Sequence, residues 1–274
     1  MVSYQDVMLS LKPTHYYPLN DKTRTRDVVG SIDGVNFGTV FTEAGALFNG
    51  SSFIELPDHP DFSAVTKGAL SVVVTMQVHN WAGKGSTEYI HWMGKGEANK
   101  HEWTFRHYCW PSGTGEAKTR PKRTSFYCFN LSGGLGAGSY FQDDDPVKVD
   151  RLIVGQYDAS TIEMWKNGLR RDSDPLSGYN IKLQNGSAPV RIGTRDMNTG
   201  YLVGAIRRVA FFSRKLTVLE QGKLFEARTL PDGDATTPEP PTIPAPKEDY
   251  IATDMNLLSK HNLLAAELRR RGLV

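Results

Sequence analysis

The segment from Ala188 to Gln221 constrains the fold of this chain more than any other stretch of its sequence. It predicts a short strand over 188–193, a loop, a second strand over 201–212 and then a short helix. Before it, many short apolar runs are separated by turn residues. The sequence holds 26 glycines and 10% aromatic residues, which suits short strands joined by tight turns. An all-β body is therefore indicated.

The other apolar runs predict the order of elements in this body. Residues 69–78 are almost continuously apolar, as expected for a strand at the centre of a sandwich. Residues 103–110 and 124–131 predict a hairpin with aromatic strands. Asn167 and Gly168 predict another hairpin, because a type I′ turn needs positive φ at both central residues. The remaining predicted elements are a helix over 4–11, a strand and polar loop over 15–21, a β-arch over 45–57, strands over 152–157 and 161–166, and a helix over 216–227.

The composition changes sharply near residue 231, which predicts a domain boundary. Prolines dominate the following stretch and favour a semi-stiff polyproline II spacer. Beyond the spacer, one helical stripe is formed by Leu257, His261, Leu264 and Leu268. A lone helix of this length is marginal in water, so we expect it to dock on a partner. The predicted parts are a leading helix (1–12), the β body (13–230), a linker (231–249) and an anchoring or oligomerisation helix (250–274).

Charge and hydropathy exclude some classes of function. The formal net charge is +2, so there is no global field for nucleic acid or an anionic membrane. No apolar run reaches the roughly 18 residues of a membrane-spanning helix, and we expect no membrane insertion. The first residues lack the basic and apolar regions of a secretory signal, which predicts synthesis in the cytoplasm. The basic loop 112–123 is interpreted as a hairpin tip or partner contact rather than a nucleic-acid site.

Five segments of the chain match, in order, the motifs of one family. They are His15–Asp21, Ala46–Pro57, Tyr157–Gly168, Val190–Gly193 and Gly204–Leu216. Over residues 13–228 the chain thereby resembles the laminin-G-like, concanavalin A-like jelly-roll domains of lectins and glucanases. The resemblance implies a jelly-roll β-sandwich that binds a ligand and only sometimes hydrolyses it. Residues 3–13 also resemble the leader that precedes such domains in bacteriophage tail and virion proteins.

The same resemblance implies what to expect of metals. Family members often hold a structural Ca²⁺, which needs six to eight oxygen ligands. Arg207 stands where the closing motif of the family has an aspartate, and a cation there argues against that site. We expect no cofactor and no metal. If calcium binds, the candidate ligands are Asp21, Asp27 and Asp33, although aspartates also stabilise turns through the backbone.

The chain lacks the signs of an enzyme. Glucanases of this fold carry a Glu-x-Asp-x-x-Glu string, whose spacing places two carboxylates about 5 Å apart. No such string is present, and Glu88, Glu97 and Glu102 do not alternate along one strand. Cys109 and Cys128 lie on the two arms of the predicted hairpin. They form either a cross-strand disulfide or, as we favour for a cytoplasmic chain, two reduced and buried thiols.

The stretch from Tyr89 to Trp110 holds the best candidates for ligand binding, and within it we single out the strand predicted over 102–110. Alternation places Arg106, Tyr108 and Trp110 on one face, and the other face belongs to the core. The first face offers hydrogen-bond donors and flat apolar rings, which carbohydrate recognition uses. The alternative is that this face lies under a loop or against another subunit.

The resemblance therefore implies a non-enzymatic virion protein of a bacteriophage, of the minor tail type. It would display the sandwich for contact with host-surface glycans or with neighbouring virion proteins. The helix 250–274 would anchor it in the tail or join copies into a homo-oligomer. The alternative is a purely structural head decoration or tail-tip spacer without a ligand, and a glycan-active enzyme is the third class. No nucleic-acid partner is expected.

Overall fold

The computed structural model describes residues 2–198 and 200–233. These two ranges make up the described body of the chain. Most of the predicted linker and the whole predicted helix 250–274 lie outside the described residues. The four residues of its apolar stripe, Leu257, His261, Leu264 and Leu268, are therefore not placed.

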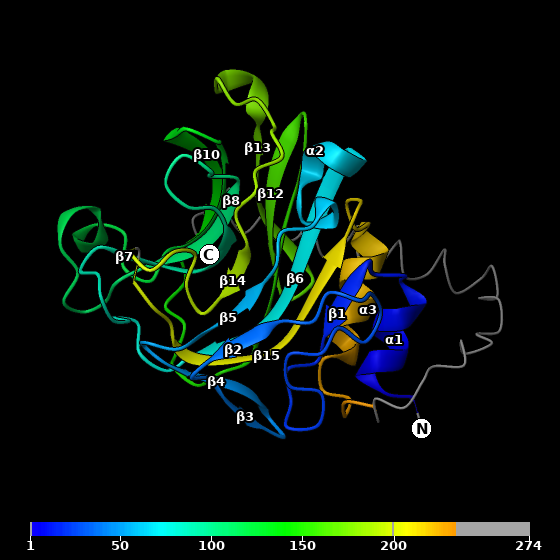
Figure 1. Cartoon of the computed structure of the whole chain (residues 1–274). Helices are drawn as coiled ribbons and strands as arrows, with labels where there is room; N and C mark the ends of the chain where they lie inside the picture. Colours follow the sequence, from blue (N-terminus) through cyan, green and yellow to red (C-terminus); the bar gives the residue numbers. More distant parts are fainter. Residues whose placement is uncertain (1, 199, 234–274) are drawn as a thin grey trace, which may run out of the picture. The chain divides into compact units, whose positions relative to one another are not determined.

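Two antiparallel sheets form a jelly-roll β-sandwich (Figure 1), as the sequence predicts. The eight-stranded sheet has the order β13-β12-β11-β6-β15-β4-β3, and β1 also pairs with β15. Its strands are β1 (His15–Tyr17), β3 (Val40–Thr42), β4 (Gly45–Asn49), β6 (Ala69–Val78), β11 (Arg151–Asp158), β12 (Thr161–Lys166), β13 (Leu169–Pro175) and β15 (Val203–Phe212).

The seven-stranded sheet has the order β10-β9-β8-β7-β14-β5-β2. Its strands are β2 (Val35–Phe37), β5 (Phe53–Leu56), β7 (Tyr89–Lys95), β8 (Trp103–Tyr108), β9 (Thr124–Asn130), β10 (Gly133–Phe141) and β14 (Val190–Ile192). The predicted β-arch is confirmed, because β4 and β5 follow one another in the chain but belong to different sheets. Short helical segments are η1 (Pro60–Phe62), α2 (Ala64–Lys67), η2 (Gly115–Lys118) and η3 (Leu176–Gly178).

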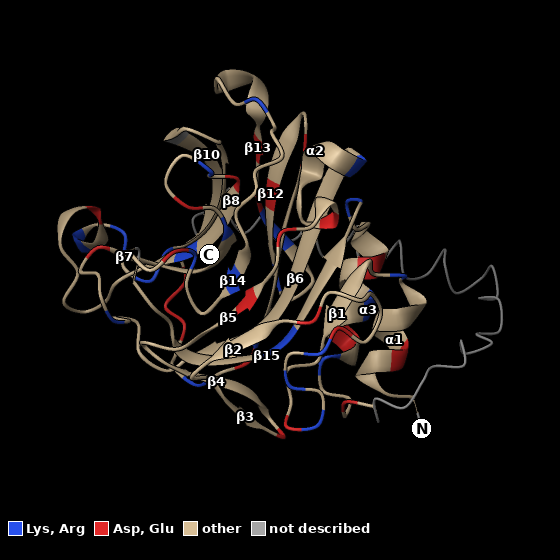
Figure 2. Cartoon of the chain, viewed as in Figure 1, with Lys and Arg blue, Asp and Glu red and all other residues tan. Residues whose placement is uncertain are grey.

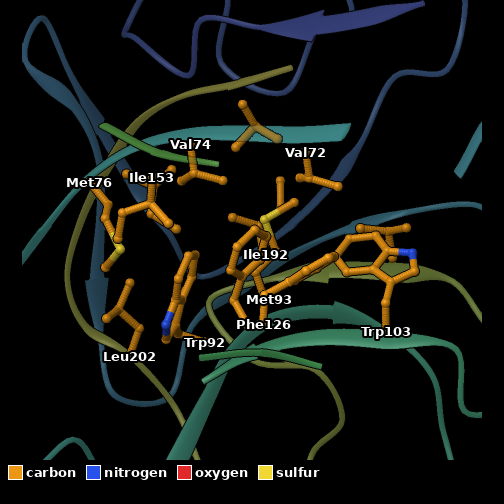
Figure 3. Packing of buried hydrophobic residues seen from close by; sticks show 14 of the residues in the cluster. Val72, Val74, Met76, Trp92, Met93, Trp103, Phe126, Ile153, Ile192 and Leu202 are labelled. Carbon is orange, nitrogen blue, oxygen red and sulfur yellow. The ribbon is translucent and has the colours of Figure 1, made fainter. Parts of the chain in front are cut away.

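The main core fills the space between the two sheets. From the eight-stranded sheet, Val72, Val74 and Met76 of β6 point into it (Figure 3). From the seven-stranded sheet, Trp103 and Phe126 meet them. Burying one large apolar side chain stabilises the fold by roughly 1.5–3 kcal/mol. This core is therefore the main source of stability in the described body.

A second apolar cluster covers the outer face of the eight-stranded sheet. Helices α1 (Tyr4–Ser10) and α3 (Val218–Ala227) contribute Met8 and Leu224 to it. Val73 of β6 points to this cluster, which explains why the sequence of β6 is apolar at almost every position. Both helices begin with a capping box, from Ser3 and Thr217, which satisfies N–H groups of the first turn. Neither α1 nor α3 covers the outer face of the seven-stranded sheet.

Several boundaries differ from the sequence-based expectations. The strand predicted over 103–110 ends at Tyr108, so Trp110 lies beyond β8. The strands β2, β3, β7, β10 and β13 were not predicted as strands. The sequence of β10 is glycine-rich and that of β13 is highly charged, so neither shows an alternating pattern. The turn at Asn167 and Gly168 is confirmed, with φ of 52° and 77°.

An ion cluster joins the edges of the two sheets. Asp143 follows β10, and its carboxylate accepts hydrogen bonds from Lys166 at 2.7 Å and from both terminal nitrogens of Arg171 at 2.7 and 2.8 Å. Lys166 ends β12 and Arg171 lies on β13, in the other sheet. Burial raises the pKa of Asp143, but the hydrogen bonds from Arg171 and Lys166 outweigh it and lower the pKa to about 2.

We expect Asp143→Asn to lower the free energy of unfolding at pH 7 by about 2 kcal/mol, which is the stabilisation that this pKa shift implies. Because the pKa is lower in the folded chain, this stabilisation is complete above about pH 4. It should be lost as the pH falls toward 2, so the two proteins should converge there. Urea denaturation at several pH values measures this.

The matched control is Asp144→Asn, because the Asp144 side chain is 95% exposed although it pairs with Lys122. We expect no measurable change for it. A difference between Asp143→Asn and the unmodified protein that stays constant down to pH 2 would contradict the ion-cluster explanation.

Candidate functional site

A hollow of about 890 Å³ lies on the outer face of the seven-stranded sheet, over β7, β8, β9 and β10. Arg106 and Tyr127 face it, because their neighbours Phe105 and Phe126 point into the core. Asp174 of β13 and Tyr179, which follows η3, also line the hollow. The lining is completed by Glu88, Tyr89, His91, His101, Glu116, Arg120, Arg123, Phe129, Ser132, Gly133, Gly134, Gly136, Gly138, Tyr140 and Arg195.

The glycines of β10 let its backbone approach the aromatic rings of β9. A Cβ atom at Gly138 would lie 2.5 Å from the ring of Tyr127, and one at Gly136 would lie 2.5 Å from the ring of Phe129. Glycine in a strand often marks such a close approach. The packing of β10 against the rings of β9 therefore depends on these glycines. The same glycines remove the apolar alternation by which a strand is predicted from sequence.

Arg106 is the central cation of the hollow. Its guanidinium carbon lies 4.0 Å from the ring centroid of Tyr127, 4.7 Å from that of Tyr89 and 5.2 Å from that of Tyr108. One terminal nitrogen donates to the Tyr108 hydroxyl at 2.9 Å. The buried Nε has no hydrogen-bond partner, and no carboxylate of the described residues forms a salt bridge with Arg106. The three rings therefore hold the Arg106 guanidinium group in place, while its Nε–H remains without an acceptor.

His91 brings a second unsatisfied group to the hollow. The residue is 5% exposed, and neither ring nitrogen has a hydrogen-bond partner. Its ring stacks on Tyr89 at 5.2 Å. Burial lowers the pKa of His91 well below its usual range, and the charges of Arg195 and Arg106 lower it further. The imidazole is therefore neutral at pH 7 and offers one donor and one acceptor.

The remaining charges of the hollow are mostly paired with one another. Glu116 accepts a hydrogen bond from Arg120 at 2.6 Å, and Glu88 accepts one from the backbone N–H of Glu116 at 3.0 Å. Arg195 bonds to Asp196 at 2.8 Å. Basic and acidic residues are interspersed over the described chain (Figure 2). The unpaired charge of Arg106 is therefore confined to the hollow and does not belong to a larger basic surface.

The structure separates the three residues predicted for carbohydrate binding. Arg106 lines the hollow. Tyr108 is fully buried, and its hydroxyl donates to Glu116 at 3.1 Å and accepts from Arg106 and Arg120. Trp110 is 41% exposed but does not line the hollow. The expectation that Trp110 shares a strand face with Arg106 is wrong, because β8 ends before it.

The three side chains selected from the sequence leave out several lining residues that the sheet brings to Arg106. Tyr89 and His91 come from β7, Tyr127 comes from β9, and Arg195 follows β14. One signal was available for β9, where Tyr127 and Phe129 alternate with core residues. For the others, the register of the strands decides which side chains meet.

The two cysteines are free and buried, which matches the favoured alternative of reduced thiols. Burial raises the pKa of Cys109 to about 11 and that of Cys128 to about 12, so both stay protonated. Burial lowers the pKa of the adjacent His107 to about 3. His107 cannot hold a proton near neutral pH, and this pair is therefore not poised for nucleophilic catalysis.

The acidic residues singled out in the sequence have structural partners. Glu97 bonds to Arg191 at 2.7 Å, and buried Glu102 pairs with Lys95. Of the calcium candidates, Asp21 is exposed. Asp33 accepts a hydrogen bond from the backbone N–H of Asp27 at 2.8 Å. The carboxylate of Asp27 accepts from backbone N–H groups of its own turn, which is the role of aspartates in turns. Arg207, at the family's aspartate position, bonds to Asp150 at 2.6 Å.

Among the described residues, no helix has the length and apolar character that crossing a bilayer requires.

Comparisons with known proteins place the fold. No protein-family model and no curated protein sequence matches the chain. Among solved structures, it is similar to the receptor-binding domain of botulinum neurotoxin C/D mosaic serotype, with a TM-score of 0.60 and 11% identity over 80% of this chain and 52% of that one. It is similar to the serotype D ligand-binding domain in complex with N-acetylneuraminic acid, with a TM-score of 0.61 and 10% identity over 81% and 53%.

The chain thus spans about half the length of these structures. At such low identity the similarity shows the fold alone, which is the jelly-roll β-sandwich. The function has to be argued from the hollow.

We expect Tyr108→Phe to lower the free energy of unfolding by about 1 to 2 kcal/mol, since the buried hydroxyl joins Arg106, Arg120 and Glu116 and the ring is kept. Urea denaturation measures the difference. Tyr140→Phe is the control, because Tyr140 is 41% exposed on the same rim. Equal losses for both variants would argue against a structural role for the Tyr108 hydroxyl.

Proposed function

We propose that the hollow on the seven-stranded sheet binds carbohydrate and that the protein is a non-enzymatic glycan-binding module. The observation that carries this proposal is Arg106, held between the rings of Tyr89 and Tyr127 beside the unpartnered nitrogens of His91. Sugars present an apolar face for rings and hydroxyl groups for fixed donors and acceptors. The hollow offers both kinds of contact.

The charge of Arg106 favours a carbohydrate that carries a carboxylate. A guanidinium group can bind a carboxylate through two parallel hydrogen bonds, and Arg106 has no acidic partner among the described residues. Two of the similar solved structures are complexes with N-acetylneuraminic acid and with SialylT. Those ligands belong to those proteins. They indicate which acidic sugars to test first.

The carboxylates of the hollow support binding rather than hydrolysis. Glycosidases need one carboxyl group to donate a proton and a second one to attack the sugar or activate water. Glu116 is engaged by Arg120 and Tyr108, and Glu88 holds the backbone of the η2 turn. Of the three carboxylates that line the hollow, only Asp174 is then left, and one carboxylate cannot form such a pair.

The proposal extends to a bacteriophage virion, in the tail rather than the head. Its support is the sequence resemblance of residues 3–13 and the stripe predicted for 250–274. The described chain ends near α1, because the backbone N–H of Tyr4 donates to the carbonyl of Pro231 at 3.0 Å. That end lies with α1 and α3 on the eight-stranded sheet (Figure 1). The hollow lies on the other sheet.

The test of the ligand is a glycan array probed with the full chain, containing sialylated, other acidic and neutral glycans. We expect binding to acidic glycans. Arg106→Met keeps an unbranched apolar side chain but removes the charged guanidinium group, so it should weaken binding about tenfold or more. The control is Arg170→Met, at an exposed position on β13.

An array without any bound glycan would favour the alternative, a structural virion protein without a ligand. Binding that Arg106→Met leaves unchanged would place the glycan elsewhere on the protein.

Light scattering tests the proposed role of the predicted helix 250–274 in joining copies. We expect the full chain to be a multimer, and a chain ending at Gly233 to be a monomer. The cut falls after Gly233 because Asp232 pairs with Arg208 at 2.5 Å and belongs to the described body. Leu264→Asp should have the same effect as the truncation, since it places a charge in the apolar stripe.

Two monomers would contradict the oligomerisation role and indicate an anchor that needs another virion protein. Two multimers would place the subunit contact in the described body instead.

A further inference from the structure

Three side chains from two separate segments meet beside the first strand. They are His15 at the start of β1, His59 just before η1, and Asp61 within η1. One ligand atom from each lies within 4.8 Å of the others. His15 Nε2 lies 3.4 Å from Asp61 Oδ2, and His59 Nδ1 lies 3.8 Å from the same oxygen.

His15 is held with one nitrogen aimed into this cluster. Its Nδ1 contacts Asp27 Oδ2 at 2.6 Å, and its Nε2 has no hydrogen-bond partner although the side chain is only 3% exposed. When Asp27 accepts the Nδ1 proton, the lone pair of His15 is left on Nε2, facing Asp61. An unpartnered donor or acceptor at such a position is rare in folded proteins.

The support of His15 is itself closely packed. The other oxygen of Asp27 accepts backbone N–H bonds from Tyr16 at 3.1 Å and Gly30 at 3.0 Å. A Cβ atom at Gly30 would lie 2.5 Å from Asp27 Oδ2 and 2.6 Å from His15 Nδ1. This arrangement of carboxylate, histidine and open nitrogen is the one in which proteins orient a histidine toward a metal.

We propose that His15, His59 and Asp61 bind one divalent transition-metal ion of the zinc type. Zinc bonds of about 2.0–2.1 Å in a tetrahedral site place ligand atoms roughly 3.3 Å apart, close to the two separations seen here. Two imidazoles and one carboxylate suit zinc, whereas calcium and magnesium prefer oxygen ligands alone. Asp27 would act as a positioning residue for His15 rather than as the calcium ligand considered from the sequence.

The neighbouring groups leave this site available. Lys67 Nζ lies 3.5 Å from Asp61 Oδ1, which is the other oxygen of the carboxylate. The backbone N–H of Asp61 donates to His59 Nδ1 at a long 3.3 Å, and the metal would replace this contact. The His59 side chain is 35% exposed, so a fourth ligand from solvent can reach the ion. The ion would link β1 to the segment between β5 and β6.

The experiment uses the full chain, freed of metal with a chelator and titrated with Zn²⁺ by calorimetry. We expect one ion per chain, a rise in Tm on adding Zn²⁺, and visible absorption of a low-symmetry site when Co²⁺ replaces Zn²⁺. His59→Ala and Asp61→Asn should each weaken binding tenfold or more, and each should abolish the Co²⁺ absorption.

The matched control is His79→Ala, which removes a described histidine outside the cluster and should bind as the unmodified protein does. No binding of Zn²⁺ by the unmodified protein would overturn the proposal. So would binding that His59→Ala and Asp61→Asn leave unchanged. Neither outcome depends on the glycan proposal, because none of the three ligands lines the hollow.

Discussion

The burial of the eight-stranded sheet on both faces is the constraint on which the rest of the structure depends. β6 and β15 lie side by side in this sheet, and each sends side chains both to the core between the sheets and to the cluster under α1 and α3. Such a strand buries apolar side chains on both of its faces, and each buried side chain stabilises the fold. These two strands therefore connect the two apolar clusters. Because α1 and α3 pack on that sheet, the outer face of the other sheet can carry polar side chains.

The polar face of the seven-stranded sheet holds buried polar atoms without hydrogen-bond partners, which lower the stability of the fold. A buried polar atom without a partner costs about 1–3 kcal/mol. Arg106 Nε and both ring nitrogens of His91 are such atoms, and all border the same hollow. His15 Nε2 is another, in a different part of the described body. Such atoms also occur elsewhere in the described body, as at His107, so they support a ligand site only together with other features: the rings around Arg106 and the carboxylate beside His15. This is why we propose one ligand site at each place.

The rigidity of the hollow is as relevant to binding as its charge. Arg106 is fixed by three aromatic rings and by the Tyr108 hydroxyl, which is itself held by Glu116. A side chain that is already ordered loses little conformational entropy when a ligand binds. The similarity to neurotoxin domains shows the fold alone, and one fold hosts unrelated functions. The proposed preference for acidic glycans therefore rests on Arg106 and its surroundings.

The sequence by itself determined the elements whose pattern is local. The apolar run of β6, the turn at Asn167 and Gly168, and the capped helices α1 and α3 were all predictable, because periodicity and turn chemistry act between near neighbours. Ordered together, they were enough to predict the jelly-roll sandwich. They also placed Arg106 on the outward face of β8.

Only the tertiary structure decided the rest. β10 is a strand although it is rich in glycine, because β9 supplies its hydrogen bonds and the rings of Tyr127 and Phe129 cover it. The end of β8 removed Trp110 from the predicted binding face, and the helix segment η2 buried Tyr108. Tyr89 and His91 reach Arg106 through the pairing of β7 with β8. Which side chains meet across strands depends on register and packing, and these are set by contacts between segments distant in the sequence.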